Sequence, residues 1–368
     1  MNKTCCLFNY GPYYRNAIYS KMDKELNYDF YFGDKVPVSL KKIDVSTYTN
    51  YQKDLKNVFF KNLLWQRGAL RNIFKPYKNY IMTGDLSGVT TWLVMILAKL
   101  SGKKVFLWSH GWYERDGKIK SFFRKLFFSL SYKVLLYGDG AKKIMMNHGF
   151  SEEKLIGIYN SLDYDKQKKV RDKLTQNDVF YEKFGNNYPT LCYIGRIQKW
   201  KRLDLLVNAM VQLRNEGTPL NLIIIGEDSE NTGLSQYIVE NNLSNNVWLY
   251  GPCYDEEEIG KLIFNTNICV SPGNVGLTAI HSLMYGTPVI THDDFGYQGP
   301  EVEAISDGVN GVFFKRNDSS DLAFKIYEWL VAYPVKDETI RERCYKIVDE
   351  KYNPYYQIEV LRSVVGEG

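Results

Sequence analysis

The sequence predicts an α/β protein of two doubly wound domains, each built on a parallel β-sheet with helices on both faces. Short apolar runs alternate with amphipathic stretches almost throughout, and a polar stretch at about 166–188 interrupts this alternation once. Near-continuous apolar strands are typical of parallel sheets that are buried on both faces. A chain of 368 residues is also too long for one core and suits two domains.

The expected elements repeat in the two halves. First-half strands are expected at 4–8, 28–32, 80–83, 105–108 and 134–137, with helices at 88–100 and 119–130. Second-half strands are expected at 191–194, 220–225, 247–250, 268–271 and 289–291, with helices near 203–216, 233–242, 255–265 and 276–285. We place the domains at 1–183 and 184–351, and expect a last helix at about 352–368 to pack back on the first domain. Ligands of such sheets bind beyond the C-terminal ends of the strands.

The charge of the chain is unevenly distributed. Residues 1–180 carry 31 Lys and Arg against 16 Asp and Glu, whereas the remainder has a net charge of −10. This asymmetry indicates that a basic face meets a polyanion, and no nucleic-acid-binding motif accompanies it. We therefore expect an anionic membrane surface, and no nucleic acid, as the partner of the basic half.

Two segments of the basic half combine aromatic and cationic residues. In 118–130 the apolar residues have helical spacing, and the cations Lys118, Lys120, Arg124 and Lys125 lie off that stripe. Residues 59–80 repeat the theme. For both segments we expect the apolar stripe to pack into the core and the cations to form a solvated edge.

The location of the protein is predicted from what the sequence lacks. The six cysteines have no metal-ligand spacing, and we interpret them as reduced structural thiols. No secretory signal is recognised, and the longest apolar helix candidate, 90–100, is far shorter than the ~20 residues that span a bilayer. We expect a cytoplasmic protein, peripheral on the inner face of the cell membrane.

The first segment with chemistry is Tyr193-Ile-Gly-Arg-Ile-Gln-Lys-Trp-Lys-Arg-Leu-Asp. A strand ends at Gly195, and Arg196 and Lys201 follow in a short loop before the next helix. Two cations beside a helix start favour a diphosphate site, because charge-assisted hydrogen bonds act on the anion there. A solvated basic turn is the alternative.

The second segment, 271–290, runs from a strand through a glycine-containing loop into a helix and a Gly-Thr-Pro strand start. Gly273 and Gly276 allow the backbone N–H groups of Val275 to Thr278 to point at a phosphate. A glycine-rich loop alone is weak evidence, but the complete string is more specific.

Together the two segments resemble the family-4 retaining glycosyltransferases of GT-B fold, the capsule and O-antigen type of sugar transferase. The resemblance covers most of 190–350, including Pro300-Glu301 and Asp307-Gly308, and is thinner at Ser109-His110-Gly111 and at 159–163. It implies two Rossmann-like domains facing across a cleft, an acceptor-binding first domain and a donor-binding second domain. The implied reaction is retaining transfer of a hexosyl group from a nucleotide diphosphate sugar to a glycan or polyprenyl-diphosphate-linked acceptor. No cofactor or metal is expected, and we interpret Asp293-Asp294 as a solvated strand end.

The resemblance also assigns roles to residues. His110, Arg196 and Lys201 are expected to be catalytic, with the two cations on the donor diphosphate and His110 on the donor sugar. Tyr13 and Arg15 are expected at the acceptor. Donor-binding residues are expected at Gly11, Gly195, Gly251, Cys253, Tyr254, Gly273, Asn274, Val275, Gly276, Leu277, Thr278 and His281.

One departure from the family concerns two glutamates that it usually places eight residues apart around the loop. Here Gly273 and His281 occupy those positions. We expect His281 to contact the ribose and backbone amides to replace the other acid.

Three other functions compete with a transferase. A degenerate, non-catalytic sugar-nucleotide binder fits the missing acids. A nucleotide-sugar 2-epimerase shares the architecture, but the Arg196 to Lys201 segment and the Gly-Thr-Pro string speak for transferases. A dinucleotide dehydrogenase is disfavoured because no G-x-G-x-x-G follows the first strand.

Overall fold

The computed structural model describes residues 3–37, 40–112 and 116–366, and contacts divide the chain into two compact units. The first unit contains 1–163 and 353–368, and the second contains 164–352. The sequence placed the boundary after residue 183. In the structure α5 (Tyr164–Arg171) and α6 (Val179–Phe184) instead pack against α9 (Glu256–Asn265), so this stretch belongs to the second unit.

The first unit is built on an eight-stranded sheet in the order β4-β3-β2-β1-β5-β6-β7-β8. All neighbouring strands are parallel except the β3–β4 pair. The strands are β1 (Lys3–Phe8), β2 (Asp29–Gly33), β3 (Tyr51–Phe60), β4 (Leu63–Arg67), β5 (Tyr77–Thr83), β6 (Lys104–Ser109), β7 (Lys133–Leu136) and β8 (Leu155–Gly157). The main helices are α1 (Asn16–Leu26), α2 (Val89–Leu100), α3 (Lys118–Leu130) and α4 (Asp139–Asn147).

The basic, aromatic segment at 59–80 does not form the amphipathic stripe that was predicted. β3 and β4 form an antiparallel hairpin around Lys61, which has a left-handed φ of 50°. Buried and exposed residues alternate along both strands in the latter part of the hairpin. A short run of apolar and basic residues is compatible with the repeat of a helix and with that of a strand. In this segment the residues form strands.

The second unit contains a six-stranded, wholly parallel sheet in the order β11-β10-β9-β12-β13-β14. Its strands are β9 (Thr190–Ile194), β10 (Asn221–Ile225), β11 (Val247–Gly251), β12 (Ile268–Ser271), β13 (Val289–His292) and β14 (Gly311–Phe314). The chain order reverses between β9 and β12. In a doubly wound sheet this switch point is where loops diverge and leave a crevice for a ligand.

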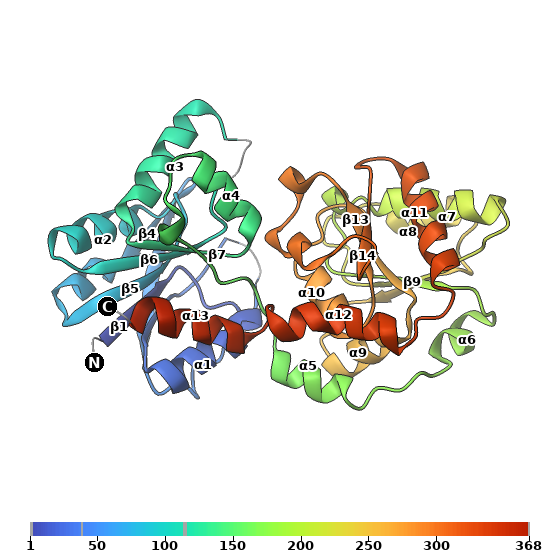
Figure 1. The fold of residues 1–368 in the computed structure, drawn as a ribbon, viewed down its shortest axis with the longest axis horizontal. Helices are drawn as coiled ribbons and strands as arrows, with labels where there is room; N and C mark the ends of the chain where they lie inside the picture. Colours follow the sequence, from blue (N-terminus) through green and yellow to red (C-terminus); the bar gives the residue numbers. More distant parts are fainter. Residues whose placement is uncertain (1–2, 38–39, 113–115, 367–368) are drawn as a thin grey trace. The chain divides into compact units, whose positions relative to one another are not determined.

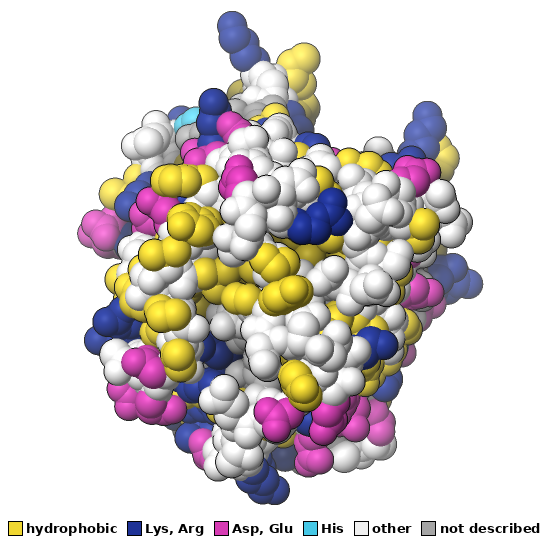
Figure 2. Space-filling model, turned by 90° about the vertical axis from the view of Figure 1, so that its right-hand side faces the viewer, with side chains coloured by type: hydrophobic (Ala, Val, Ile, Leu, Met, Phe, Trp, Pro, Cys, Tyr) yellow, Lys and Arg dark blue, Asp and Glu magenta, His cyan; other side chains and the backbone are white. Residues whose placement is uncertain are grey.

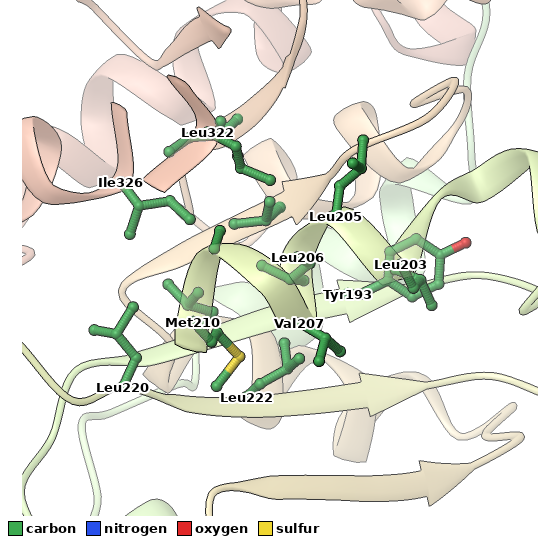
Figure 3. Close-up of a cluster of buried hydrophobic side chains, with 14 of the residues drawn as sticks. Tyr193, Leu203, Leu205, Leu206, Val207, Met210, Leu220, Leu222, Leu322 and Ile326 are labelled. Carbon is green, nitrogen blue, oxygen red and sulfur yellow. The ribbon is translucent and has the colours of Figure 1, made fainter. Parts of the chain in front are cut away.

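Helices complete the second unit by covering both faces of this sheet. They are α7 (Leu203–Asn215), α8 (Leu234–Glu240), α9, α10 (Thr278–Met284), α11 (Ser319–Ala332) and α12 (Glu338–Glu350). Figure 3 shows how α7 directs Leu206, Val207 and Met210 toward the strands, with Leu322 and Ile326 of α11 beside them. This buried core holds the strand ends that carry the loops of the candidate site.

The last helix, α13 (Pro354–Gly366), belongs to the first unit and lies beside α1 (Figure 1). Pro354 opens this helix, at a position where the missing N–H of proline is harmless. Gln357 ties it down by donating to the Tyr159 carbonyl oxygen and accepting from Ser161 Oγ. The chain therefore returns to the first unit at its end.

The surfaces of the two units differ in character. Figure 2 looks onto one face of the second unit, where acidic side chains gather in groups near the lower edge. On the first unit, α3 exposes Ile119, Phe122, Phe123 and Leu126. The predicted packing of this stripe into the core is wrong for these four residues and confirmed for Phe127, which is buried beside Phe128.

Two further observations concern the whole chain. The six cysteines are all free thiols, and five of them are buried. Of the helices in the described residues, none combines the length and the apolar character that crossing a bilayer requires.

Candidate functional site

The loop after β9 brings the predicted cations to the switch point of the second sheet. Gly195 has a φ of 141° and donates its N–H to the Ile225 carbonyl oxygen at 2.9 Å. A short 3-10 turn, η4 (Lys199–Lys201), then leads into α7. Such a φ is accessible mainly to glycine, so Gly195 allows the chain to turn out of the strand at this point.

The cations in this loop differ in exposure. The Arg196 guanidinium is exposed and forms no hydrogen bond or ion pair with the residues that the structure describes. Lys201 is half-buried, and its Nζ donates to the Asn274 carbonyl oxygen at 2.5 Å. Burial lowers the pKa of Lys201 to about 8; the charge of Arg196 lowers it too, and Glu301 opposes this. Two nearby positive charges indicate a site that is suited to an anion.

The loop after β12 packs directly against the cation loop. Gly273 donates its N–H to the Lys201 carbonyl oxygen at 3.0 Å. A Cβ at this position would lie 2.3 Å from the Trp200 carbonyl oxygen. Residue 273 therefore has no room for a side chain. This gives a physical reason for a glycine at the position where the family that the sequence resembles has a glutamate.

Three successive N–H groups follow Gly273. In the described part of the chain, the N–H groups of Gly276, Leu277 and Thr278 form no hydrogen bond. The Thr278 hydroxyl donates to the Ile194 carbonyl oxygen at 2.8 Å, which joins this loop to the end of β9. The three N–H groups are donors that an anion can use.

Two predictions for this loop need correction. The Val275 N–H does not point at an open site, because it donates to Gln298 Oε1 at 2.9 Å. The helix that follows spans only Thr278–Met284, shorter than the expected 276–285. The anion site therefore rests on loop N–H groups and two cations.

His281, expected at the ribose, has an acidic neighbour that the sequence did not reveal. Its Nε2 lies 2.8 Å from Oε1 of Glu256, the first residue of α9. The same oxygen accepts from the Tyr285 hydroxyl at 2.7 Å and from Gln167 at 3.0 Å. The contact between His281 and ribose stays a prediction, but the carboxylate of Glu256 lies directly beside His281.

Two more residues belong to this region: Gln298, which no sequence pattern singled out, and Glu301, which was noted without a role. Gln298 donates to Thr291 Oγ1 and to the His292 carbonyl oxygen while it holds Val275. Glu301 is buried and electrostatically close to Lys201. The Pro-Glu pair at 300–301 was noted in the sequence, so its position was a usable signal, whereas no signal marked Gln298.

The remaining predicted donor residues of the second unit lie at the end of β11. Gly251 has a φ of 87°, and its carbonyl oxygen accepts from the Gly226 N–H at 2.9 Å. Tyr254 is exposed, and Cys253 is partly exposed. Asp293 and Asp294 both interact with Arg316, through its backbone N–H and its guanidinium respectively.

The described part of the second unit contains cavities that border the loop after β9. One of about 310 Å³ is lined by Gly273 and Asn274 together with Trp200, Arg202, Pro272, His292, Tyr297, Arg316 and Asn317. A second, of about 440 Å³, is lined by residues that include Lys199, Leu203 and Tyr237, and by none of the predicted site residues. The smaller cavity is therefore the one beside the candidate phosphate loop.

In the first unit, His110 and Arg15 lie together at the carboxyl end of the sheet. The His110 ring lies 4.7 Å from the Tyr137 ring, centroid to centroid. Arg15 is buried, lies over Trp108 and Tyr137, and donates to the Tyr137 hydroxyl. The His110 side chain is exposed, and partial loss of hydration together with the charge of Arg15 holds its pKa below the usual value, so the imidazole is neutral at pH 7.

The other predicted residues of the first unit have different surroundings. Tyr13 is exposed, with Lys41 Nζ 4.4 Å from its ring centroid. Gly11 accepts from the Ile43 N–H, and a Cβ there would lie 2.9 Å from the Ile43 side chain. The acceptor role of Tyr13 and Arg15 and the donor role of Gly11 stay predictions.

The geometry of the second unit can be compared with known proteins. Residues 175–346 match the model of the family "Glycosyl transferases group 1". This match lies wholly within the second unit and includes the loops after β9 and β12, which meet there.

Relatives of the chain carry the same kind of name. An uncharacterised glycosyltransferase of Methanocaldococcus jannaschii is 23% identical over 331 residues, which are 82% of this chain and 80% of that protein. A glycogen synthase of Thermodesulfovibrio yellowstonii is 24% identical over 63% of this chain, and the match covers 49% of the synthase.

Solved structures extend the likeness to both units. HepE from Anabaena, in complex with UDP, matches with a TM-score of 0.74 and 14% identity over the full length of both chains. The lipopolysaccharide outer core galactosyltransferase WaaB matches with a TM-score of 0.71 and 15% identity over 99% of this chain and 100% of that one. These likenesses confirm the predicted GT-B fold.

Proposed function

We propose that this protein is a retaining glycosyltransferase that moves a hexosyl group from a nucleotide diphosphate sugar to a glycan or lipid-linked oligosaccharide in surface polysaccharide synthesis. The observation that carries the proposal is the meeting at one sheet edge of Arg196, Lys201 and three N–H groups that have no partner among the described residues. The group 1 match over the same residues and the UDP bound by HepE support a nucleotide-sugar donor.

The proposed chemistry breaks the bond between the anomeric carbon and the diphosphate while the acceptor oxygen bonds to the same face of that carbon. Lys201, Arg196 and the N–H groups of 276–278 stabilise the negative charge that develops on the leaving diphosphate. The acceptor proton passes to a leaving phosphate oxygen, as the family resemblance implies. These positioned cations and dipoles take the role that a metal has in other transferases.

His110 is assigned to the donor sugar in this proposal. A neutral imidazole donates one hydrogen bond and accepts another, which suits a sugar hydroxyl. The proposal for Tyr13 and Arg15 is contact with the acceptor.

A donor panel tests the proposal. UDP-, GDP-, dTDP- and CMP-sugars are compared by thermal shift, and a ligand at 100 times its Kd should add about 2.7 kcal/mol of stability. Transfer or slow hydrolysis of the donor that binds is then followed by NMR, which reports the anomeric configuration of the product. Retained configuration is expected. Inverted configuration contradicts the retaining mechanism, and binding without any turnover favours a non-catalytic sugar-nucleotide binder.

We further propose that the first unit docks on the inner face of the cell membrane through α3. The helix exposes 78% of Ile119 and 65% of Phe122, together with Phe123 and Leu126. Leu93, Ile96 and Leu100 of the adjoining α2 are also exposed. Exposed apolar side chains beside cations are typical of helices that lie in a membrane interface.

The cations beside this apolar surface set the choice of lipid. Lys118, Lys120 and Lys125 are exposed, and each basic residue near an anionic surface adds about 1 kcal/mol. Arg124 was predicted among them, but it is buried, where it pairs with Asp116 and donates to the Gly111 carbonyl oxygen. Arg124 therefore has a structural role and is left out of the docking surface.

Vesicle binding tests the membrane proposal. Phe122→Ser with Phe123→Ser should weaken binding to vesicles containing anionic lipid, and Lys118→Glu with Lys125→Glu should weaken it and reduce its salt dependence. Val331→Ser, an exposed apolar position on α11 of the second unit, is the matched control. Equal binding of the wild type to neutral and anionic vesicles, or unchanged binding of both double variants, would contradict the proposal.

A further inference from the structure

The carboxylate of Glu256 is held by one oxygen only. Oε1 is approached by His281 Nε2 of α10, by the hydroxyl of Tyr285 directly after α10, and by Gln167 Nε2 of α5. Burial alone would raise the pKa of Glu256, but the His281 charge and these hydrogen bonds lower it to about 2. The side chain is therefore an oriented, ionised carboxylate at neutral pH.

The second oxygen of Glu256 is available. Oε2 accepts no hydrogen bond from the described residues and is not among the buried unpaired atoms. A carboxylate with one oxygen fixed by three donors and the other open to solvent is arranged to accept a hydrogen bond from a ligand. An ion pair that served packing alone would leave no reason for this division between the two oxygens.

The place of Glu256 relates it to the candidate phosphate loop. His281 lies one helical turn, about 5.4 Å along the axis, beyond Leu277. Glu256 follows the exposed loop at the end of β11, which carries Tyr254. A diphosphate on the N–H groups of 276–278 would therefore have the carboxylate within reach of the group that follows the phosphates.

We propose that Glu256 accepts a hydrogen bond from a ribose hydroxyl of the nucleotide and that His281 positions Glu256 for this contact. The inference rests on the proposed function, because it presupposes that a nucleoside diphosphate occupies the site. Ribose presents vicinal hydroxyls, and an ionised carboxylate oxygen is a strong acceptor for them. The acid thus comes from α9, while residue 281 contributes a donor that orients it.

Paired nucleotides test this proposal on the full chain. UDP and GDP are compared with their 2′,3′-dideoxy analogues by isothermal titration, using the nucleotide that binds the wild type. Glu256→Gln should weaken the ribonucleotide by about tenfold or more and leave the affinity for the dideoxy analogue unchanged. His281→Gln should show a smaller loss of the same kind. Glu257→Gln, an exposed acid in the same helical turn, is the matched control and should bind both nucleotides like the wild type.

Each outcome separates the contact from a packing role. Equal weakening of ribo- and dideoxynucleotide by Glu256→Gln would overturn the assignment, because a structural defect acts on both ligands. Unchanged binding of both would overturn it as well. A wild type that binds neither UDP nor GDP in either form would instead contradict the proposed function, on which the assignment depends.

Discussion

The two units share one strand order around their central strands but present different groups at the carboxyl edge of the sheet. In the second unit, the edge carries backbone N–H groups and Lys201, beside the exposed Arg196. In the first, it carries His110 on Tyr137, with Arg15 held against Trp108. A diphosphate suits the second arrangement, whereas a neutral imidazole beside aromatic rings suits a sugar. One topology can thus present an anion-binding set of groups in one unit and a neutral imidazole beside aromatic rings in the other.

The largest expected effect tests the anion side of this comparison. Lys201→Ala and Arg196→Ala should each cost roughly 2–4 kcal/mol of transition-state stabilisation, because each removes a charged donor from a developing anion. Initial rates and titration with the nucleoside diphosphate measure the loss. Lys199→Ala, in the same turn, is the control. Wild-type turnover in both variants would reject the diphosphate assignment.

Gly273 tests why the second unit has no acid in its loop. Gly273→Ala should destabilise the protein by about 1–3 kcal/mol, because the new Cβ meets the Trp200 backbone. Gly117→Ala, whose Cβ would meet nothing within 4 Å, serves as the control in chemical denaturation. Equal stability of the two variants would show that space does not determine residue 273.

The two histidines sharpen the comparison between the units. His281→Ala should weaken nucleotide binding by about 1–3 kcal/mol, because Glu256 loses the donor that orients it. His110→Ala should lower turnover more than nucleotide affinity, because its proposed partner is the sugar. Titration beside initial rates distinguishes these outcomes, and normal nucleotide binding by His281→Ala would move His281 to a structural role.

The smallest effect is a pH dependence of nucleotide affinity. Without a bound nucleotide, the pKa of Lys201 is about 8. A bound diphosphate stabilises the protonated amine and therefore raises this pKa. The affinity for the diphosphate should therefore be at its maximum below pH 8. Above pH 8 it should fall by up to about tenfold per pH unit, which corresponds to about 1.36 kcal/mol of binding free energy. Titrations between pH 7 and 9.5 measure the slope, and Lys201→Met should abolish it. A wild-type affinity that stays constant over this range would remove Lys201 from the contact.

Patterns that are local in sequence predicted the fold and the positions of the loops that follow β9 and β12. The alternation of strands and helices, Gly195 before Arg196 and the strand-to-loop transition at Gly273 are all short-range signals. Hydrogen-bond partners that lie far apart in sequence were not predictable, as Gln298 at Val275 and Glu256 at His281 show. The outward face of α3 was missed because spacing defines an apolar stripe without showing which side meets the core.

The most direct test of the central claim is hydrogen exchange on the full chain with and without the nucleoside diphosphate that binds best. The account predicts new protection at residues 195–202 and at the N–H groups of 276–278, which lack partners in the described structure. It predicts little change in α2 and α3 of the first unit, which carry none of the predicted donor-binding residues. Protection confined to the first unit, with residues 276–278 exchanging as fast as before, would contradict the account.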